Sequence, residues 1–154
     1  MHSIVGLIHN PVLIGAVISW FLAQALKIPL HYVLEHKWDL SRFHGAGGMP
    51  SSHTAMVVCT ATMVGALDGF DSAYFAIAVV LASIVMYDAT GVRRETGRQA
   101  TIINQILREV LIEGKPISDK ELKELVGHKP IEVLGGFVCG LTVAGLYLLY
   151  LANR

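Results

Sequence analysis

The apolar residues of this chain gather into four long runs, separated by segments that hold most of its polar residues. The runs are Pro11 to about Leu26, Ser52 to Leu67, Ala73 to about Val92, and Pro130 to Ala152. About 20 apolar residues allow a helix to cross a bilayer, whose hydrocarbon core is roughly 30 Å thick. The second run is shorter, and the segment after it, residues 68–72, has the composition of a turn. The pattern predicts an all-α polytopic membrane bundle of about four transmembrane helices, in which the second and third runs form a tight hairpin or thin the bilayer locally.

Composition supports a single integral membrane domain over residues 1–154. Hydrophobic residues make up 53% of the chain and charged residues 16%, whereas about a quarter of an ordinary soluble domain is charged. This balance excludes a water-soluble globule and a disordered chain. No basic patch lies outside the segments that flank the runs, so we expect no nucleic-acid partner. Cys59 and Cys139 lie within apolar runs and are expected to pack as small hydrophobes.

The basic residues predict an orientation in the membrane. With four spans, both termini lie on one side, and residues 28–51 and 93–129 lie on the other. Eleven of the 12 Lys and Arg residues fall in or beside these two segments, and only Arg154 lies opposite. Because cytoplasmic segments carry such an excess, we expect both segments to face the cytoplasm, in a bacterial cytoplasmic membrane. Lys27, at the end of the first run, is expected to snorkel to the interface.

Two spacings concern helices and their packing. Apolar residues recur at intervals of three and four within residues 95–111, which predicts an amphipathic cytoplasmic helix along the membrane surface. Gly65 with Gly69, and Gly136 with Gly140, have the spacing typical of closely packed transmembrane helices.

A glycine-rich segment that ends at Gly48 leads through Ser51 and Ser52 to His53. Backbone N–H groups at a helix start, together with hydroxyls and flexible glycines, form sites for anions such as phosphate. His53 is expected in the first turn of the helix, where an imidazole can donate a proton to a leaving oxygen. The alternative is structural, with Ser51 or Ser52 capping the helix and the glycines making a turn.

A second cluster opens the fourth run. His128 and Glu132 are four residues apart, so a helix that begins near His128 places both on one face. There the carboxylate can hold the imidazole tautomer that leaves the other ring nitrogen free, as in a nucleophilic histidine. In the alternative, Pro130 takes the first helical position, Glu132 is a favourable charge in the first turn, and His128 is a loop residue.

Further polar candidates follow the third run. Asp88 lies just inside the apolar region, where an ionisable side chain is costly and indicates function. Arg93 and Arg94 are its expected partners and suit phosphate recognition, or else form the ordinary basic flank of a span. Gln99 and Asn104 lie beyond them.

Two basic residues precede the glycine-rich segment. Lys37 and Arg42, with Trp38 between them, can complete a cationic pocket. Anchoring at the membrane surface accounts equally well for Lys37 and Trp38.

Pro50-Ser51-Ser52-His53, combined with His128-Lys129-Pro130-Ile131-Glu132-Val133-Leu134-Gly135-Gly136, resembles the signature of the type 2 phosphatidic acid phosphatase superfamily. Those motifs read Pro-Ser-Gly-His and His-x-x-x-Asp-Val-x-x-Gly. The segments Gly-Gly-Met-Pro-Ser-Ser-His-Thr-Ala and Tyr-Asp-Ala-x-Gly-Val-Arg-Arg look like the divergent bacterial and plant branch of that superfamily. Its members are small integral membrane proteins related to acid phosphatases and vanadium haloperoxidases.

The resemblance implies hydrolysis of a lipid phosphate or pyrophosphate through a phosphohistidine, without a metal. It makes His128 the nucleophile, Glu132 its orienting carboxylate, His53 the general acid and Ser51 a phosphate ligand. Two basic motifs of the superfamily, Lys-x6-Arg-Pro and a Ser-Arg pair before the nucleophile, are absent here. We therefore hypothesise that Arg93 and Arg94 bind phosphate in their place.

The sequence thus favours a membrane phosphatase whose site faces the cytoplasm and whose substrate comes from the bilayer. One alternative is a non-catalytic protein that binds or transports an anionic lipid or phosphate. The other is a metal-dependent hydrolase in which Asp88, Glu132, His53 and His128 converge on a divalent ion. The identity of the lipid and the formation of a homo-oligomer stay open.

Overall fold

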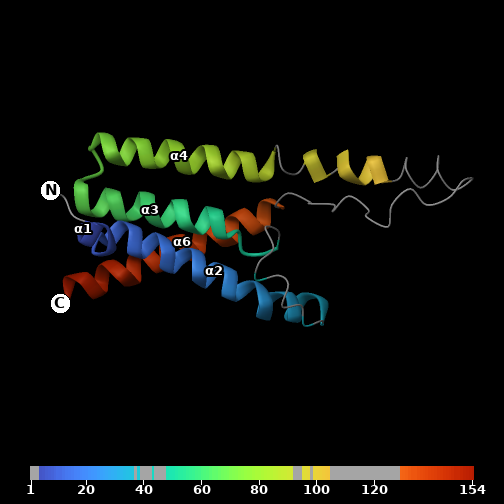
Figure 1. Cartoon of the computed structure of the whole chain (residues 1–154), viewed down its shortest axis with the longest axis horizontal. Coiled ribbons are helices and arrows are strands. Elements are labelled where there is room, and N and C mark those ends of the chain that lie inside the picture. The colour runs from blue at the N-terminus through green and yellow to red at the C-terminus, as the bar shows by residue number, and fades with distance from the viewer. Residues whose placement is uncertain are drawn as a thin grey trace, which may run out of the picture.

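A computed structural model of the chain describes residues 4–36, 38, 43, 48–91, 95–97, 99–104 and 129–154 (Figure 1). Its elements are α1 (Ile4–Ile8), α2 (Pro11–Glu35), α3 (Ser52–Asp68), α4 (Ala73–Thr90) and α6 (Pro130–Ala152). The all-α prediction is confirmed, since the described ranges contain helices and turns but no strand. The four apolar runs correspond to α2, α3, α4 and α6.

Helix α2 is longer than its apolar run. Asn10 caps its start, where the side-chain oxygen accepts hydrogen bonds from the backbone N–H groups of Val12 (2.9 Å) and Leu13 (3.2 Å). The helix passes Lys27 and ends only at Glu35. The expectation that Lys27 snorkels at a helix end is wrong, because this side chain lies inside the bundle with 2% of its surface exposed.

Among the residues that the structure describes, three segments are long and apolar enough to cross a membrane, namely Pro11–Val33, Ala73–Asn104 and Pro130–Ala152. Helix α3 is not among them, because its 17 residues span only about 26 Å. It packs against α2, α4 and α6, so it is the central helix of the bundle. A short polar turn, residues 69–72, joins α3 to α4, as the predicted hairpin requires, and Ser72 caps α4 by accepting from the Phe75 N–H (3.1 Å).

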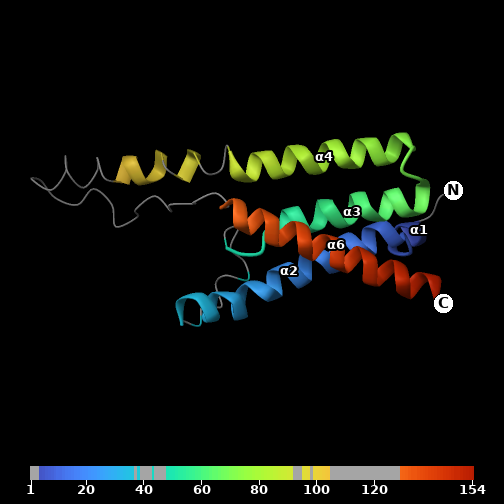
Figure 2. The same ribbon diagram turned by 180° about the vertical axis from the view of Figure 1, so that it is seen from behind.

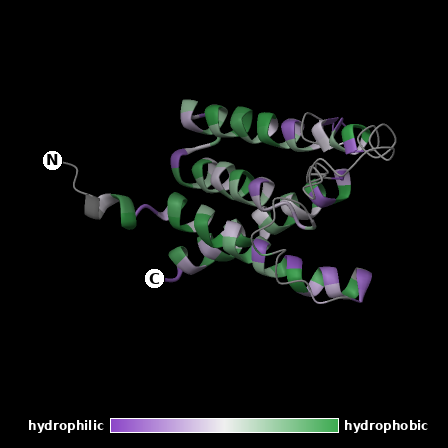
Figure 3. Ribbon diagram, turned by 45° about the vertical axis from the view of Figure 1, so that its right-hand side comes forward, coloured by the Kyte–Doolittle hydropathy of each residue, from purple (hydrophilic) through white to green (hydrophobic). Residues whose placement is uncertain are grey.

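Helices α2, α3, α4 and α6 alternate in direction, so the bundle has two distinct ends (Figures 1 and 2). One end holds both termini and the turn at residues 69–72, and we call it the turn end. The other holds the starts of α3 and α6, and we call it the Ser51 end. Hydrophobic residues lie along the length of the helices, and hydrophilic residues lie mostly near the helix ends (Figure 3).

The bundle core combines small residues with two glycines of α6. Cys59, Met63, Val143 and Ala144 form a buried cluster with the partly buried Cys139, as expected for cysteines that serve as packing residues.

The Gly136 and Gly140 spacing is confirmed as a helix contact. A Cβ at Gly140 would fall 2.5 Å from the Ala55 carbonyl oxygen, and a Cβ at Gly136 would collide with that of Ser51. The interpretation of Gly69 was wrong, because this residue lies in the turn with φ +95°. Its partner Gly65 is covered by the rings of Phe70 and Phe75.

Residues 95–97 and 99–104 are helical, as predicted for the first part of the amphipathic segment. They continue beyond α4 in the direction of that helix (Figures 1 and 2). A helix along the membrane surface would turn away from a spanning helix, and these residues do not. The rest of the predicted amphipathic helix, residues 105–111, lies outside the described residues.

Candidate functional site

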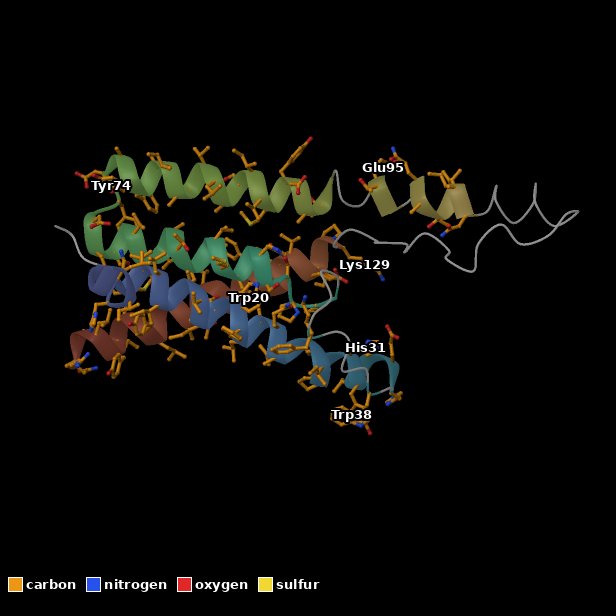
Figure 4. The ribbon with its side chains drawn as sticks, in the orientation of Figure 1. Trp20, His31, Trp38, Tyr74, Glu95 and Lys129 are labelled. Carbon is orange, nitrogen blue, oxygen red and sulfur yellow. The ribbon has the colours of Figure 1, made fainter. Side chains whose placement is uncertain are left out.

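Residues 49–51, which connect the glycine-rich segment to α3, meet the start of α6 directly at the Ser51 end. The Ser51 N–H donates a hydrogen bond to the Glu132 carbonyl oxygen at 2.9 Å. A Cβ at Gly135 would lie 3.0 Å from Met49 Cε and 3.5 Å from Pro50 Cβ, so the segment rests closely on α6. Lys129 marks this end of α6 (Figure 4). The two motifs, far apart in the sequence, therefore form one structural unit.

The residues that lead into α3 combine a glycine in an unusual backbone conformation with two buried serines. Gly48 has φ +90°, which residues with a side chain rarely adopt. Ser51 and Ser52 follow, and both are buried. Helix α3 begins at Ser52, so the first N–H groups of the helix lie next to these hydroxyls.

Ser51 also has the structural role that we considered as the alternative. It is the N-cap of α3, and its Oγ accepts from the Thr54 N–H at 3.4 Å and from Thr54 Oγ1 at 3.0 Å. A serine hydroxyl has one proton and two acceptor lone pairs. Capping therefore uses the acceptor sites of the Ser51 hydroxyl.

His53 lies in the first turn of α3, as predicted, and its side chain is half-buried. Glu132 lies in the first turn of α6, and the Ser51–Glu132 hydrogen bond joins these two turns. The structure therefore brings the histidine and the carboxylate to the same end of the bundle.

The side chain of Glu132 caps the start of α6. The helix begins at Pro130, two residues after His128, and Lys129 is its N-cap. The Glu132 Oε2 accepts a hydrogen bond from the Lys129 backbone N–H at 3.2 Å. His128 lies outside the described residues, so its pairing with Glu132 stays a prediction.

The polar candidates after the third run are spread along the chain. Asp88 is half-buried in the last turn of α4, at the Ser51 end, whereas Gln99 is exposed and Asn104 is 4% exposed. Within the described ranges, no three His, Cys, Asp or Glu side chains lie close enough together to hold a metal ion. Asp88, Glu132 and His53 therefore do not form such a group.

The remaining predicted site residues lie outside the described residues. They are the nucleophile candidate and the four basic candidates: His128, Lys37, Arg42, Arg93 and Arg94.

Sequence reasoning missed one buried basic residue, Lys27. Ala16, Ser19, Ala23 and Lys27 are all 2% exposed or less, and they recur at intervals of three and four along α2. This is the period of one buried helical face. If this spacing is continued past Leu26, the last residue of the apolar run, it predicts that Lys27 lies on the buried face of α2.

Comparison with known proteins identifies relatives along most of the chain. The model of a family described as the divergent PAP2 family matches residues 8–143. The uncharacterized membrane protein YuiD of Bacillus subtilis (strain 168) is 39% identical over 145 residues, which cover 88% of this chain and 92% of that protein. No solved structure matches. Together with the long apolar helices, this relative identifies the chain as an integral membrane protein.

Proposed function

Because this chain belongs to the divergent PAP2 family, we propose that it is a membrane phosphatase that hydrolyses a lipid phosphate or pyrophosphate. Its site is the Ser51 end of the bundle, which faces the cytoplasm according to the distribution of basic residues. The substrate is a lipid that reaches the site from the bilayer.

The proposed reaction has two steps. A ring nitrogen of His128 attacks phosphorus, the bond from phosphorus to the leaving oxygen breaks, and His53 donates a proton to that oxygen. His53 then removes a proton from a water molecule, whose oxygen attacks the phosphohistidine. The phosphorus–nitrogen bond breaks, inorganic phosphate leaves, and both histidines return to their starting states.

The other candidates have supporting roles in this proposal. Glu132 orients His128, and Ser51 and Ser52 bind phosphate oxygens together with the first N–H groups of α3 and the backbone at Gly48. Positive charge comes from the basic candidates Lys37, Arg42, Arg93 and Arg94. Asp88, Gln99 and Asn104 supply further polar contacts.

The observation that carries the proposal is the hydrogen bond from the Ser51 N–H to the Glu132 carbonyl oxygen. It holds the loop that precedes His53 against the first turn of α6, which begins two residues after His128. The hydrogen bond thus connects the chain segments that carry the two histidines. Such proximity is required if both side chains are to act on one phosphorus atom.

We expect purified protein in nanodiscs to release inorganic phosphate from one member of a panel of lipid phosphates in the presence of EDTA, with inhibition by vanadate. His128→Asn removes the nucleophile and should abolish turnover. His53→Asn removes the general acid and should lower turnover by about a hundredfold to ten-thousandfold.

His9→Asn is the matched control, because His9 is exposed and lies near the turn end, and it should keep wild-type turnover. Wild-type rates in His53→Asn and His128→Asn would contradict the mechanism. Activity only after addition of a divalent ion would favour the metal-dependent alternative.

A second candidate function is binding of an anionic lipid without turnover. It is favoured by the capping roles of the Ser51 hydroxyl and the Glu132 carboxylate, which account for both side chains structurally. Saturable binding of a lipid phosphate in the same nanodiscs, with no phosphate release from any member of the panel, would support this function over the first.

A further inference from the structure

One face of α3 is partly exposed along the whole helix. Its residues recur at intervals of one, three and four, which is the period of a single helical face. We call this face the outer stripe, and it consists of His53, Met56, Val57, Thr60, Val64 and Leu67. Met56 and Leu67 are 37% and 45% exposed, and the other four residues are half-buried. Apart from the half-buried Thr62, the remaining residues from Ser52 to Gly65 are buried.

The neighbouring helices pack on the other faces of α3. Helix α6 lies opposite the stripe, since a Cβ at Gly140 would be 2.9 Å from Val58 Cβ, and Val58 is two residues before Thr60. Helix α2 lies on one side, where a Cβ at Gly15 would be 3.6 Å from Met63 Cγ. Helix α4 packs on α3 as well, but α2 and α4 do not contact each other. Figures 1 and 2 show α3 between α4 and α2, with α6 behind it in the view of Figure 1, so no described helix covers the stripe.

The outer stripe faces the hydrocarbon of the bilayer. The helices on either side belong to segments long and apolar enough to cross a membrane, Pro11–Val33 and Ala73–Asn104. From Met56 to Leu67 the chain carries no charged side chain. The Thr60 hydroxyl donates to the Met56 carbonyl oxygen at 2.9 Å, so its hydrogen-bonding need is met within the helix. A surface of this composition is compatible with hydrocarbon around it.

The stripe begins at the candidate site. Its first residue is His53, in the first turn of α3. Leu67 is fourteen residues after His53, which corresponds to about 21 Å along the helix. Half of the hydrocarbon core of a bilayer is about 15 Å thick. The stripe is therefore long enough for the chain of a lipid whose headgroup lies at its start.

A lipid bound by its phosphate at the start of α3 also needs space for its chain. Of the described helices, α6 occupies one face of α3, and α2 and α4 occupy the two sides. The outer stripe is the face that these helices leave to the chain. Because the chain moves from one apolar environment to another, the stripe adds little affinity, and contacts to the headgroup must hold the lipid.

We propose that the outer stripe of α3 binds the hydrocarbon chain of a lipid phosphate, which enters between α2 and α4 with its headgroup at His53. This inference rests on the proposed function for the position of the headgroup, but it does not require turnover. It assigns the chain to one side of the bundle, the side opposite α6.

Photolabelling of wild-type protein in phosphatidylcholine nanodiscs tests where the chain lies. The probes are phosphatidic acid and a polyprenyl monophosphate, each with a diazirine near the middle of a chain, and mass spectrometry identifies the labelled residues. We expect one of these probes to label the segment around Thr60, and the same lipid without the diazirine to displace this labelling. A phosphatidylcholine probe with the same diazirine measures ordinary contact with the bilayer.

Val80 is the matched position on the outer face of α4. A Cβ at Gly65 would be 2.9 Å from Phe75 Cδ2, so these two residues lie at one level of the hairpin. Thr60 is five residues before Gly65 and Val80 is five residues after Phe75, so Thr60 and Val80 lie at the same depth. Val80 is 58% exposed, and we expect the same labelling around it with all probes and no displacement.

Two results of the photolabelling would overturn the inference. One is a ratio of labelling at Thr60 to labelling at Val80 that is the same for the lipid phosphates and for phosphatidylcholine, which would make the stripe an ordinary lipid contact. The other is no labelling at Thr60 with any probe, as a second copy of the chain lying on the stripe would produce.

A pair of variants tests whether the stripe is needed. Thr60→Trp fills the stripe and should lower the displaceable labelling of the protein by about tenfold, within the range expected for overpacking a close contact. Val80→Trp adds the same side chain at the same depth and should match wild type. Both variants should bind inorganic phosphate as wild type does, because this ligand has no chain. Undiminished displaceable labelling in Thr60→Trp would count against the inference.

The inference and the proposed function can fail separately. Displaceable labelling at Thr60 in wild-type protein that releases no phosphate from any lipid would refute the phosphatase proposal alone. Release of phosphate from a lipid probe that does not label Thr60 would refute the position of the chain alone.

Discussion

Ser51 connects helix capping to the candidate site. Its side chain is fully buried, its Oγ accepts from the N–H and hydroxyl of Thr54, and its backbone N–H donates to Glu132. Removing the hydroxyl therefore affects the start of α3 whether or not phosphate binds there. Ser72 provides the comparison, because it caps α4 in the same way at the turn end.

We predict that Ser51→Ala and Ser72→Ala each lower the free energy of unfolding by about 1 kcal/mol, the usual effect of losing an N-cap. Only Ser51→Ala should also weaken phosphate binding, since Ser72 lies at the opposite end of the bundle. Unfolding by SDS in mixed micelles measures the first effect, and phosphate titration measures the second. Equal phosphate affinities in the two variants would show that Ser51 is a cap alone.

At the scale of elements, α3 and α6 pack closely because two residues of α6 in the contact are glycines, which have no side chain. Gly136 faces the Ser51 carbonyl oxygen and Thr54, and Gly140 faces the Ala55 carbonyl oxygen. Small residues let helix backbones approach closely in membranes, where packing rather than water drives association. This approach brings the first turn of α6 to residues 49–51.

Gly136→Ala should lower the free energy of unfolding by about 1 to 3 kcal/mol, the range for overpacking a close contact. It should also lower phosphatase activity, because separation of α3 from α6 breaks the Ser51–Glu132 hydrogen bond. Gly145→Ala tests the same substitution in the same helix, where a Cβ meets nothing within 4 Å, and should leave both quantities unchanged. Similar losses in the two variants would contradict the packing argument.

At the scale of the whole molecule, the basic residues are concentrated toward one end of the bundle. The alternating helices place the ends of segments 28–51 and 93–129 at the Ser51 end, and these segments hold or adjoin nearly all the basic residues. By the positive-inside rule, we expect that end to face the cytoplasm, with the candidate site on the cytoplasmic side.

Cysteine labelling in intact bacterial cells tests this orientation. Asp71→Cys, in the turn between α3 and α4, should react with a membrane-impermeant maleimide added outside. Trp38→Cys, which is exposed at the Ser51 end, should react only after the cells are opened. Wild-type protein gives the background from Cys59 and Cys139 within the bundle. The reverse pattern would place the site outside.

The sequence by itself determined the helical class, the start of each long helix and the family, because these follow from local signals: apolar runs, a capping residue such as Ser51, and residue motifs. It also predicted that Gly136 and Gly140 make a close contact. It did not identify their partner, because the position of a neighbouring helix is not a local property.

Only the tertiary structure decided which polar residues are buried and which segments meet. Lys27 looked like the end of a span, because hydropathy averages over a helix and does not register the face that packs on α3. Glu132 caps the start of α6 with its side chain, and its carbonyl oxygen accepts from the Ser51 N–H, a pairing that the sequence did not indicate. Burial and pairing of this kind depend on contacts between residues far apart in the chain.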